Sequence, residues 1–539
     1  MHAGLKRFKA RIVLCGAAVA AATIASVAYA DEASCKALAG MTFPAKAMQF
    51  PNTGAKIMSG EWIAERPNFQ AYCKVRSEIT PVDPKSTRTL VATNLPALWN
   101  NKAVQFGGGG LNGTLVEGTG LLRDDPPGGQ PLAKGYVTLG TDGGHPNAKP
   151  EIGVFMLNAE AELNNAYGAN KNGHDLSLAI INAYYKAAPK RFYFYGGSEG
   201  GRQALVAVQM FPASYDGAVA NVPSLNKTLQ YIAKNNVWMS THNGGWMNKA
   251  KIHLLAKATM DLCDGLDGLK DGVISKYRAC GELSKPEALR CPDGKDTGDT
   301  CLSDKQIAAV KTVRGRFDIG FPLKNGIQTL AGWSVGAEDG SGGYNDQIMA
   351  EKAEPKDDDP GSYISGNQFV RYAIMRDANS RGAPDYQKYK QRIVELSNMS
   401  DMSNPDLTPF LKRGGKLILK GNGADYQVGA ETVFEYYGNV VKKMGQATVD
   451  KFVRIYMNPG VAHGGSGLRA DGSKVPDKID LLGQIDNWVE KGEAPGDLTV
   501  VAYEKGVPVA SKPMCQFPTY PRYQAGNVNV SGSYVCTAF

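Results

Sequence analysis

The 539-residue chain has no Cys-x-x-Cys pair, no dense run of basic residues and, beyond residue 30, no apolar stretch long enough to span a bilayer. The first absence disfavours zinc, which usually takes cysteines at such spacing. The second makes nucleic acid a poor partner, since Lys and Arg are dispersed and the net charge is only +8. The third argues against a membrane-spanning helix there. No feature of the sequence specifies an oligomeric state.

Residues 1–30 are typical of a signal peptide. A basic start precedes an apolar, alanine-rich stretch, and Ala28-Tyr29-Ala30 fits a cleavage site of the A-x-A type. The leader has no Arg-Arg pair, and no cysteine directly follows the cut, which disfavours twin-arginine export and a lipid anchor there. Removal of the leader lowers the net charge from +8 to +4. We therefore expect a periplasmic or secreted protein.

Nine cysteines are present, and Cys15 would leave with the leader. An even number of cysteines in an exported chain indicates disulfides. Eight cysteines allow about 105 connectivities, so the pairing proposed here follows proximity in sequence alone. The expected pairs are Cys35–Cys73, Cys263–Cys280, Cys291–Cys301 and Cys515–Cys536.

The stretch 191–210 combines an aromatic, strand-like run, a Gly-x-Ser-x-Gly turn around Ser198, and a run of helix formers. A strand, a tight turn and a helix in this order predict a nucleophile elbow. The amide of Glu199, at the start of the helix, would face a developing oxyanion. Because the chain has 63 glycines, the alternative is a glycine-rich turn with an idle serine.

A second glycine run, at 107–113, contains a G-x-G-x-x-G match. We reject a dinucleotide site, because no helix starts after the run and no βαβ unit with a ribose-binding acid follows. No organic cofactor is expected. In a serine hydrolase such a run supplies a second oxyanion amide, here from Gly109 or Gly110. The alternative is a flexible loop.

Strand and helix patterns alternate before residue 221 and again after residue 410, which favours an α/β fold with a parallel sheet covered by helices. Between them, the chain is richer in short helices, turns and charge. We expect an α/β catalytic domain formed by residues 31–221 and 410–539, with an inserted lid domain at 222–409.

The lid contains an aspartate-rich loop after a predicted helix at 246–260. Asp264, Asp267 and Asp271 are spaced for a tight loop around a hard cation, and the backbone oxygens of Leu269 and Val273 would complete the shell. The spacing is not that of an EF-hand. A structural calcium ion is the favoured reading, and a solvated acidic turn is the alternative.

Two later loops offer an acid and a base. Asp425 follows a strand predicted at 415–420, and His463 follows another at 451–456. Serine needs a base to take its proton, and a carboxylate orients the imidazole. Asp142 and Asp471 are less well placed rivals for the acid. The remaining histidines of the mature chain are expected to be structural: His145, His174, His242 and His253.

The order Ser198, Asp425, His463 is that of the α/β-hydrolases. The elbow with its Gly-Gly-Arg-Gln tail, the Pro-Gly-x-x-His motif and the Asp-x-x-Asp-Gly-x-x-Asp-Gly loop resemble the tannase/feruloyl esterase family over nearly the whole mature chain. The resemblance implies a Ser-Asp-His hydrolase with a calcium-binding lid that cleaves aromatic esters. The family usually has cysteines beside the serine and the histidine, where this chain has Gly197 and Gly464.

The motifs predict a serine hydrolase, and the resemblance implies that it is an esterase acting through an acyl-enzyme on small esters of aromatic acids of the feruloyl, galloyl or terephthaloyl type. Two alternatives remain open, a non-catalytic ligand-binding protein on the same fold and a hydrolase of a lactone or another non-aromatic ester. Trp333, Arg371 and Arg376 are candidate substrate contacts in the lid, although packing and salt bridges explain them as well.

Overall fold

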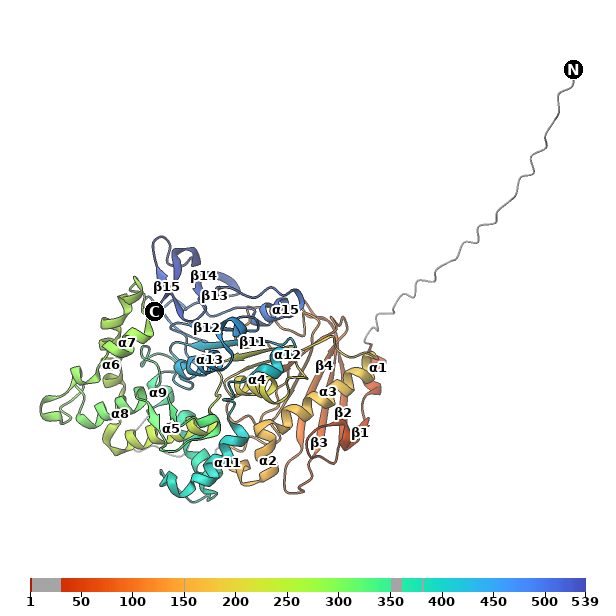
Figure 1. Cartoon of the computed structure of the whole chain (residues 1–539), viewed down its shortest axis with the longest axis horizontal. Coiled ribbons are helices and arrows are strands. Elements are labelled where there is room, and N and C mark those ends of the chain that lie inside the picture. The colour runs from red at the N-terminus through yellow and green to blue at the C-terminus, as the bar shows by residue number, and fades with distance from the viewer. Residues whose placement is uncertain (2–30, 150, 350–360, 381) are drawn as a thin grey trace.

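The structure is a computed structural model that describes residues 1, 31–149, 151–349, 361–380 and 382–539 (Figure 1). Its centre is a ten-stranded sheet in the order β1-β2-β3-β4-β6-β5-β7-β8-β11-β12. The strands are β1 (Thr42–Phe43), β2 (Gly54–Ile63), β3 (Tyr72–Thr80), β4 (Thr89–Pro96), β5 (Lys102–Phe106), β6 (Val137–Thr141), β7 (Arg191–Gly197), β8 (Gly217–Asn221), β11 (Lys416–Asn422) and β12 (Val453–Asn458).

The sheet has an antiparallel and a parallel half. Strands β1 to β4 and β6 pair antiparallel, whereas β6, β5, β7, β8, β11 and β12 pair parallel. Parallel strands end at the same edge of a sheet, so the loops after β5, β7, β11 and β12 meet there. These loops carry the glycine run, Ser198, Asp425 and His463.

Alternate residues of the central strands pack into two different apolar cores. Ala218 and Leu417 face the core that includes α3 (Ala169–Tyr185), α4 (Glu199–Met210) and α13 (Ala430–Met444). Val219 and Ile418 face the opposite core, which includes α15 (Leu481–Lys491). Because both faces are covered, the strands are apolar on both sides, as parallel strands usually are. The helices outside the β8–β11 insertion are α1 (Glu32–Ala37), α2 (Ala159–Leu163), α3 (Ala169–Tyr185), α4 (Glu199–Met210), α13 (Ala430–Met444), α14 (Gln446–Val449) and α15 (Leu481–Lys491).

The chain between β8 and β11 is mostly helical, and many of its apolar side chains pack into a second core, to which Leu111, Phe155 and Tyr426 from outside the segment also contribute. In Figure 1, α5 to α9 form a group beside the sheet. The division into a catalytic domain and a lid at 222–409 stays a prediction. The elements of this segment are α5 (Lys227–Ser240), α6 (Lys249–Cys263), α7 (Tyr277–Leu283), α8 (Asp304–Arg314), β9 (Phe317–Asp318), β10 (Thr329–Leu330), α9 (Tyr344–Gln347), α10 (Gly361–Gln368), α11 (Lys390–Ser400) and α12 (Thr408–Lys412).

The C-terminal tail forms two hairpins, β13 (Leu498–Glu504) with β14 (Val507–Met514) and β15 (Thr519–Tyr523) with β16 (Tyr534–Ala538). The sequence pattern at 475–492 predicts a closing helix, but α15 begins only after Asp480, whose side chain accepts a hydrogen bond from the Gly483 amide. Residues 2–30, the predicted signal peptide, lie outside the described residues.

All four predicted disulfides are present, Cys35–Cys73, Cys263–Cys280, Cys291–Cys301 and Cys515–Cys536. The first ties the short α1 to β3, and the last joins the segment between the two hairpins of the tail, just after β14, to the final strand β16. Within the described residues, no helix is both long and apolar enough for a bilayer.

Candidate active site

Ser198 stands at a sharp turn between β7 and α4. Its backbone has φ 62° and ψ −121°, a region that non-glycine residues rarely adopt. The turn requires glycine on both sides, because a Cβ at Gly196 would lie 2.2 Å from the Gly200 oxygen, and one at Gly200 would lie 2.9 Å from the Gly107 carbonyl carbon. The nucleophile elbow predicted from the sequence is therefore present, and the glycine run packs directly against it.

Ser198, His463 and Asp425 form a hydrogen-bonded chain. His463 Nε2 lies 2.9 Å from Ser198 Oγ, and His463 Nδ1 lies 2.8 Å from Asp425 Oδ2. Asp425 is fully buried, and its other oxygen accepts hydrogen bonds from the amides of Gln427 and Val428, each at 2.8 Å. The carboxylate is thus fixed, and it can orient an imidazole that faces the serine hydroxyl.

The rival acids lie elsewhere. Asp142 accepts hydrogen bonds from the Leu90 and Gly144 amides, and Asp471 is exposed and caps the Ser473 amide. Burial raises the pKa of Asp142 to about 6. Each of the other described histidines has a hydrogen bond or ion pair of its own, as expected of structural residues: His145, His174, His242 and His253.

The predicted oxyanion donors border the elbow. Glu199 is the first residue of α4, so its amide has no partner within the helix. In the glycine run, the Gly108 amide is already committed to Gln203 Oε1 at 2.9 Å. A Cβ built at Gly109 or Gly110 would meet no atom within 4 Å, so this part of the loop is open. These two amides therefore stay the candidates for the second donor.

A buried ion cluster, which sequence reasoning missed, lies behind the elbow. Arg202 donates from Nε to Glu199 Oε1 at 2.9 Å, and Lys227 Nζ lies 3.3 Å from the same oxygen. Burial alone would raise the pKa of Glu199, but the charges of Arg202 and Lys227 outweigh it and lower that pKa. Burial lowers the pKa of Lys227 to about 8. The one feature of the sequence that indicates this cluster is the i, i+3 spacing of Glu199 and Arg202, which places the two charges side by side on a helix.

The same cluster reaches the glycine run. Lys227 Nζ donates to Asn165 Oδ1 at 2.7 Å, and Asn165 Nδ2 donates to the Leu111 carbonyl oxygen at 2.8 Å. Leu111 directly follows Gly110. The cluster therefore connects the start of α4 to the loop that carries the candidate oxyanion amides.

The predicted calcium loop folds back on itself. Asp264 accepts hydrogen bonds from the amides of Asp271 and Gly272. Asp267 Oδ2 and Asp271 Oδ2 are buried and have no hydrogen-bond partner among the described residues. Burial raises the pKa of Asp264 and of Asp267. Two buried, unsatisfied carboxylate oxygens fit a hard cation such as calcium.

Two buried basic side chains face this loop. Lys512 Nζ lies 3.8 Å and Arg469 Nε lies 4.0 Å from Asp271 Oδ2. Both distances are longer than a hydrogen bond, so these cations balance charge without occupying the carboxylate oxygens. Burial lowers the pKa of Lys512.

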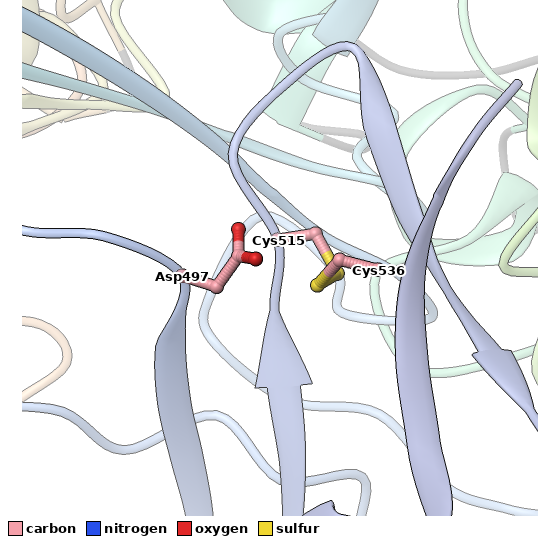
Figure 2. Close-up of side chains that lie close together, drawn as sticks. All are labelled: Asp497, Cys515 and Cys536. Atoms are coloured by element: carbon pink, nitrogen blue, oxygen red, sulfur yellow. A yellow bond between two sulfur atoms is a disulfide. The ribbon is translucent and has the colours of Figure 1, made fainter.

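Another group of possible ligands belongs to the tail. Asp497, Cys515 and Cys536 bring their ligand atoms within 4.8 Å of one another (Figure 2). The two sulfur atoms are bonded to each other, so neither is a thiolate that could hold a metal. Asp497 Oδ1 accepts a hydrogen bond from the Gln516 amide. We assign no metal to this group.

The candidate lid contacts have structural partners. Arg371 is buried and donates to the Ala378 carbonyl, Arg376 donates to the Leu157 carbonyl, and Trp333 is buried in the lid core. A cavity of about 1000 Å³ adjoins Ala424 and Ala462, but neither Ser198 nor His463 lines it.

A parallel sheet whose strand ends carry an elbow serine, a carboxylate and a histidine defines an α/β-hydrolase. A family model described as "Tannase and feruloyl esterase" matches residues 73–537. The chain belongs to this family and is a carboxylic ester hydrolase.

The relatives agree with this assignment. An uncharacterised esterase of Agrobacterium fabrum is 33% identical and is matched over 93% of this chain and 92% of its own length. A mono(2-hydroxyethyl) terephthalate hydrolase of Piscinibacter sakaiensis is 28% identical and is matched over 95% of this chain and 93% of its own length. The crystal structure of feruloyl esterase B from Aspergillus oryzae, 22% identical, has a TM-score of 0.75 and is matched over 94% of this chain and 100% of its own. That structural likeness supports the α/β fold.

Proposed function

We propose that this enzyme hydrolyses esters of aromatic carboxylic acids through an acyl-enzyme on Ser198. The observation that carries the proposal is the unbroken hydrogen-bonded chain from Ser198 Oγ through the His463 ring to the buried carboxylate of Asp425. Its residues have the roles of nucleophile, general base and orienting acid.

In the first half-reaction, Ser198 Oγ bonds to the ester carbonyl carbon while His463 Nε2 takes the hydroxyl proton. The carbonyl oxygen becomes an oxyanion, which the amides of Glu199 and of Gly109 or Gly110 stabilise. The bond to the alcohol oxygen then breaks, and His463 returns the proton to it. In the second half-reaction, water attacks the acyl-enzyme with the same proton transfers and releases the acid.

The substrate class rests on the names of relatives. The terephthalate hydrolase and a probable feruloyl esterase of Arthroderma benhamiae, 29% identical over 82% of this chain, both bear the names of aromatic acids. We expect methyl ferulate, methyl gallate or a terephthalate monoester to be cleaved with a kcat/KM at least about 10-fold above that of an aliphatic ester or a lactone, a margin that differences in pocket contacts supply. Liquid chromatography of the released acids measures this. Preferred cleavage of the aliphatic ester or lactone would refute the aromatic assignment.

We further propose a structural calcium ion in the lid, held by the carboxylates of Asp264, Asp267 and Asp271 and the carbonyl oxygens of Leu269 and Val273. The unsatisfied oxygens of Asp267 and Asp271 support this. The ion would fasten the loop that follows α6 and would take no part in the ester chemistry. Export to an oxidising compartment is proposed as well, because the four disulfides fit one.

Removal of calcium by a chelator is expected to lower the melting temperature. A ligand at 100 times its Kd stabilises the folded state by about 2.7 kcal/mol. Asp267→Ala should lower the melting temperature to the same degree and abolish the effect of the chelator. Asp261→Ala, in an exposed ion pair with Lys257 outside the loop, is the matched control and should respond to the chelator as the natural chain does. An unchanged melting curve after chelation would exclude the ion.

A further inference from the structure

The loop that carries His463 is tied firmly to one neighbour. Asn422 Nδ2 donates to the Ala462 carbonyl oxygen at 2.9 Å, and the Ala424 amide donates to the Val461 carbonyl oxygen at 3.1 Å. These bonds join the histidine loop to the end of β11, which also carries Asp425. They fix His463 relative to its acid, but they do not fix it relative to Ser198.

Arg123 connects the loop that carries His463 to the elbow that carries Ser198. Its Nη1 donates a hydrogen bond to the carbonyl oxygen of His463. The rest of its head group lies against the residue before the serine, because a Cβ built on Gly197 would be 2.5 Å from Nε, 2.9 Å from Cζ and 3.0 Å from Cδ of Arg123. One side chain therefore touches the elbow and the histidine loop together.

The base of this side chain is fixed. Asp124, the next residue, is fully buried, and its Oδ2 lies 2.9 Å from Lys420 Nζ on β11 and 2.6 Å from Asn221 Nδ2 at the end of β8. The Asp124 carbonyl oxygen accepts a hydrogen bond from the Ile479 amide at 2.6 Å. Arg123 thus projects from a turn anchored to the same sheet edge as the active site.

The two glycines beside the site have different surroundings. All three of the nearest atoms to a Cβ at Gly197 belong to Arg123, whereas a Cβ at Gly464 would meet no atom within 4 Å. Position 197 must therefore lack a side chain for the guanidinium to fit, but position 464 has no such constraint.

We propose that Arg123 is a positioning residue that holds His463 in line with Ser198 as a non-covalent brace between the two loops. Its head group fills the space beside Gly197, next to the serine. The inference rests on the proposed serine mechanism.

The test compares Arg123→Ala, Gly197→Ala and the double variant. Arg123→Ala should lower kcat about 10- to 100-fold with KM within about threefold, because a shift of about 1 Å in a catalytic group costs rate rather than binding. Gly197→Ala should lower kcat similarly by displacing the guanidinium. In the double variant, the methyl group introduced at position 197 has no guanidinium to displace. The kcat losses of the two single variants should therefore not multiply. Gly464→Ala should keep kcat within about threefold.

The results separate this inference from the mechanism on which it rests. Thermal melts should show each variant folded, since Arg123 is only half-buried and forms no ion pair with any of the described residues. If the natural chain turns over an aryl ester and Arg123→Ala retains full kcat, the brace is refuted while the serine mechanism stands. If the kcat losses of Arg123→Ala and Gly197→Ala multiply in the double variant, the brace is refuted as well. A natural chain whose Ser198→Ala variant is fully active would instead refute the mechanism.

Discussion

His463→Ala is expected to lower kcat for an aryl ester by roughly 10⁴- to 10⁶-fold, with little change in KM. Without the imidazole, the proton of Ser198 Oγ has no acceptor at hydrogen-bond distance among the described residues, although the candidate oxyanion amides remain. Steady-state kinetics with a chromogenic aryl ester measures the loss. The melting temperature should change little, because the His463 side chain is partly exposed.

Two further variants test the role of the acid and provide a control. Asp425→Asn should lower kcat by about 10⁴-fold, because the amide no longer holds the imidazole in the tautomer that accepts the serine proton. His253→Ala is the matched control, since this histidine is exposed and pairs with Asp339 far along the chain from the elbow. It should leave kcat unchanged. A His463→Ala enzyme with more than a tenth of the natural activity would contradict the assigned base.

Arg202→Met is expected to destabilise the fold by about 3–5 kcal/mol, as is typical when one partner of a buried ion pair is removed. Arg202 is fully buried and donates to Glu199 and also to the main-chain oxygens of Asn165, Ala166 and Ser400. Its loss would leave the buried Glu199 carboxylate with Lys227 alone, and three carbonyls without this donor. Urea unfolding followed by fluorescence measures the change.

Adding Glu199→Gln to Arg202→Met separates the contribution of the Glu199–Arg202 charge pair to stability from that of the other contacts of Arg202. The neutral amide removes the cost of a poorly paired buried carboxylate, so the double variant should recover part of the lost stability. Equal stability of the single and double variants would mean that the hydrogen bonds to the three carbonyls, rather than the charge pair, account for the loss.

The local motifs were predictable from the sequence, and the long-range partners were not. The elbow, Asp425 and His463 each follow an apolar strand, and parallel strands bring such positions to one edge. Arg123 and Lys227 reach the site from other parts of the chain, and nothing in their neighbouring residues points to it. Their role depends on tertiary contacts that only coordinates reveal.

For the fold as well, local patterns in the sequence were the more predictable part. The alternating strand and helix patterns predicted the parallel half of the sheet, and the short separations predicted all four disulfide pairs. The antiparallel strands β2 and β3 were not predicted, although β3 alternates buried and less buried residues with the period of two that is typical of a half-exposed strand. The late start of α15 was missed because Val475 and Ile479 are apolar yet lie in extended chain.

The most direct test of the whole account is covalent labelling with a fluorophosphonate, which reacts with a serine only when a neighbouring base activates it. We expect one adduct per chain, located by peptide mass spectrometry on Ser198, and none in the His463→Ala variant. An adduct on another serine, or a natural chain that hydrolyses esters yet stays unlabelled, would contradict the proposed mechanism.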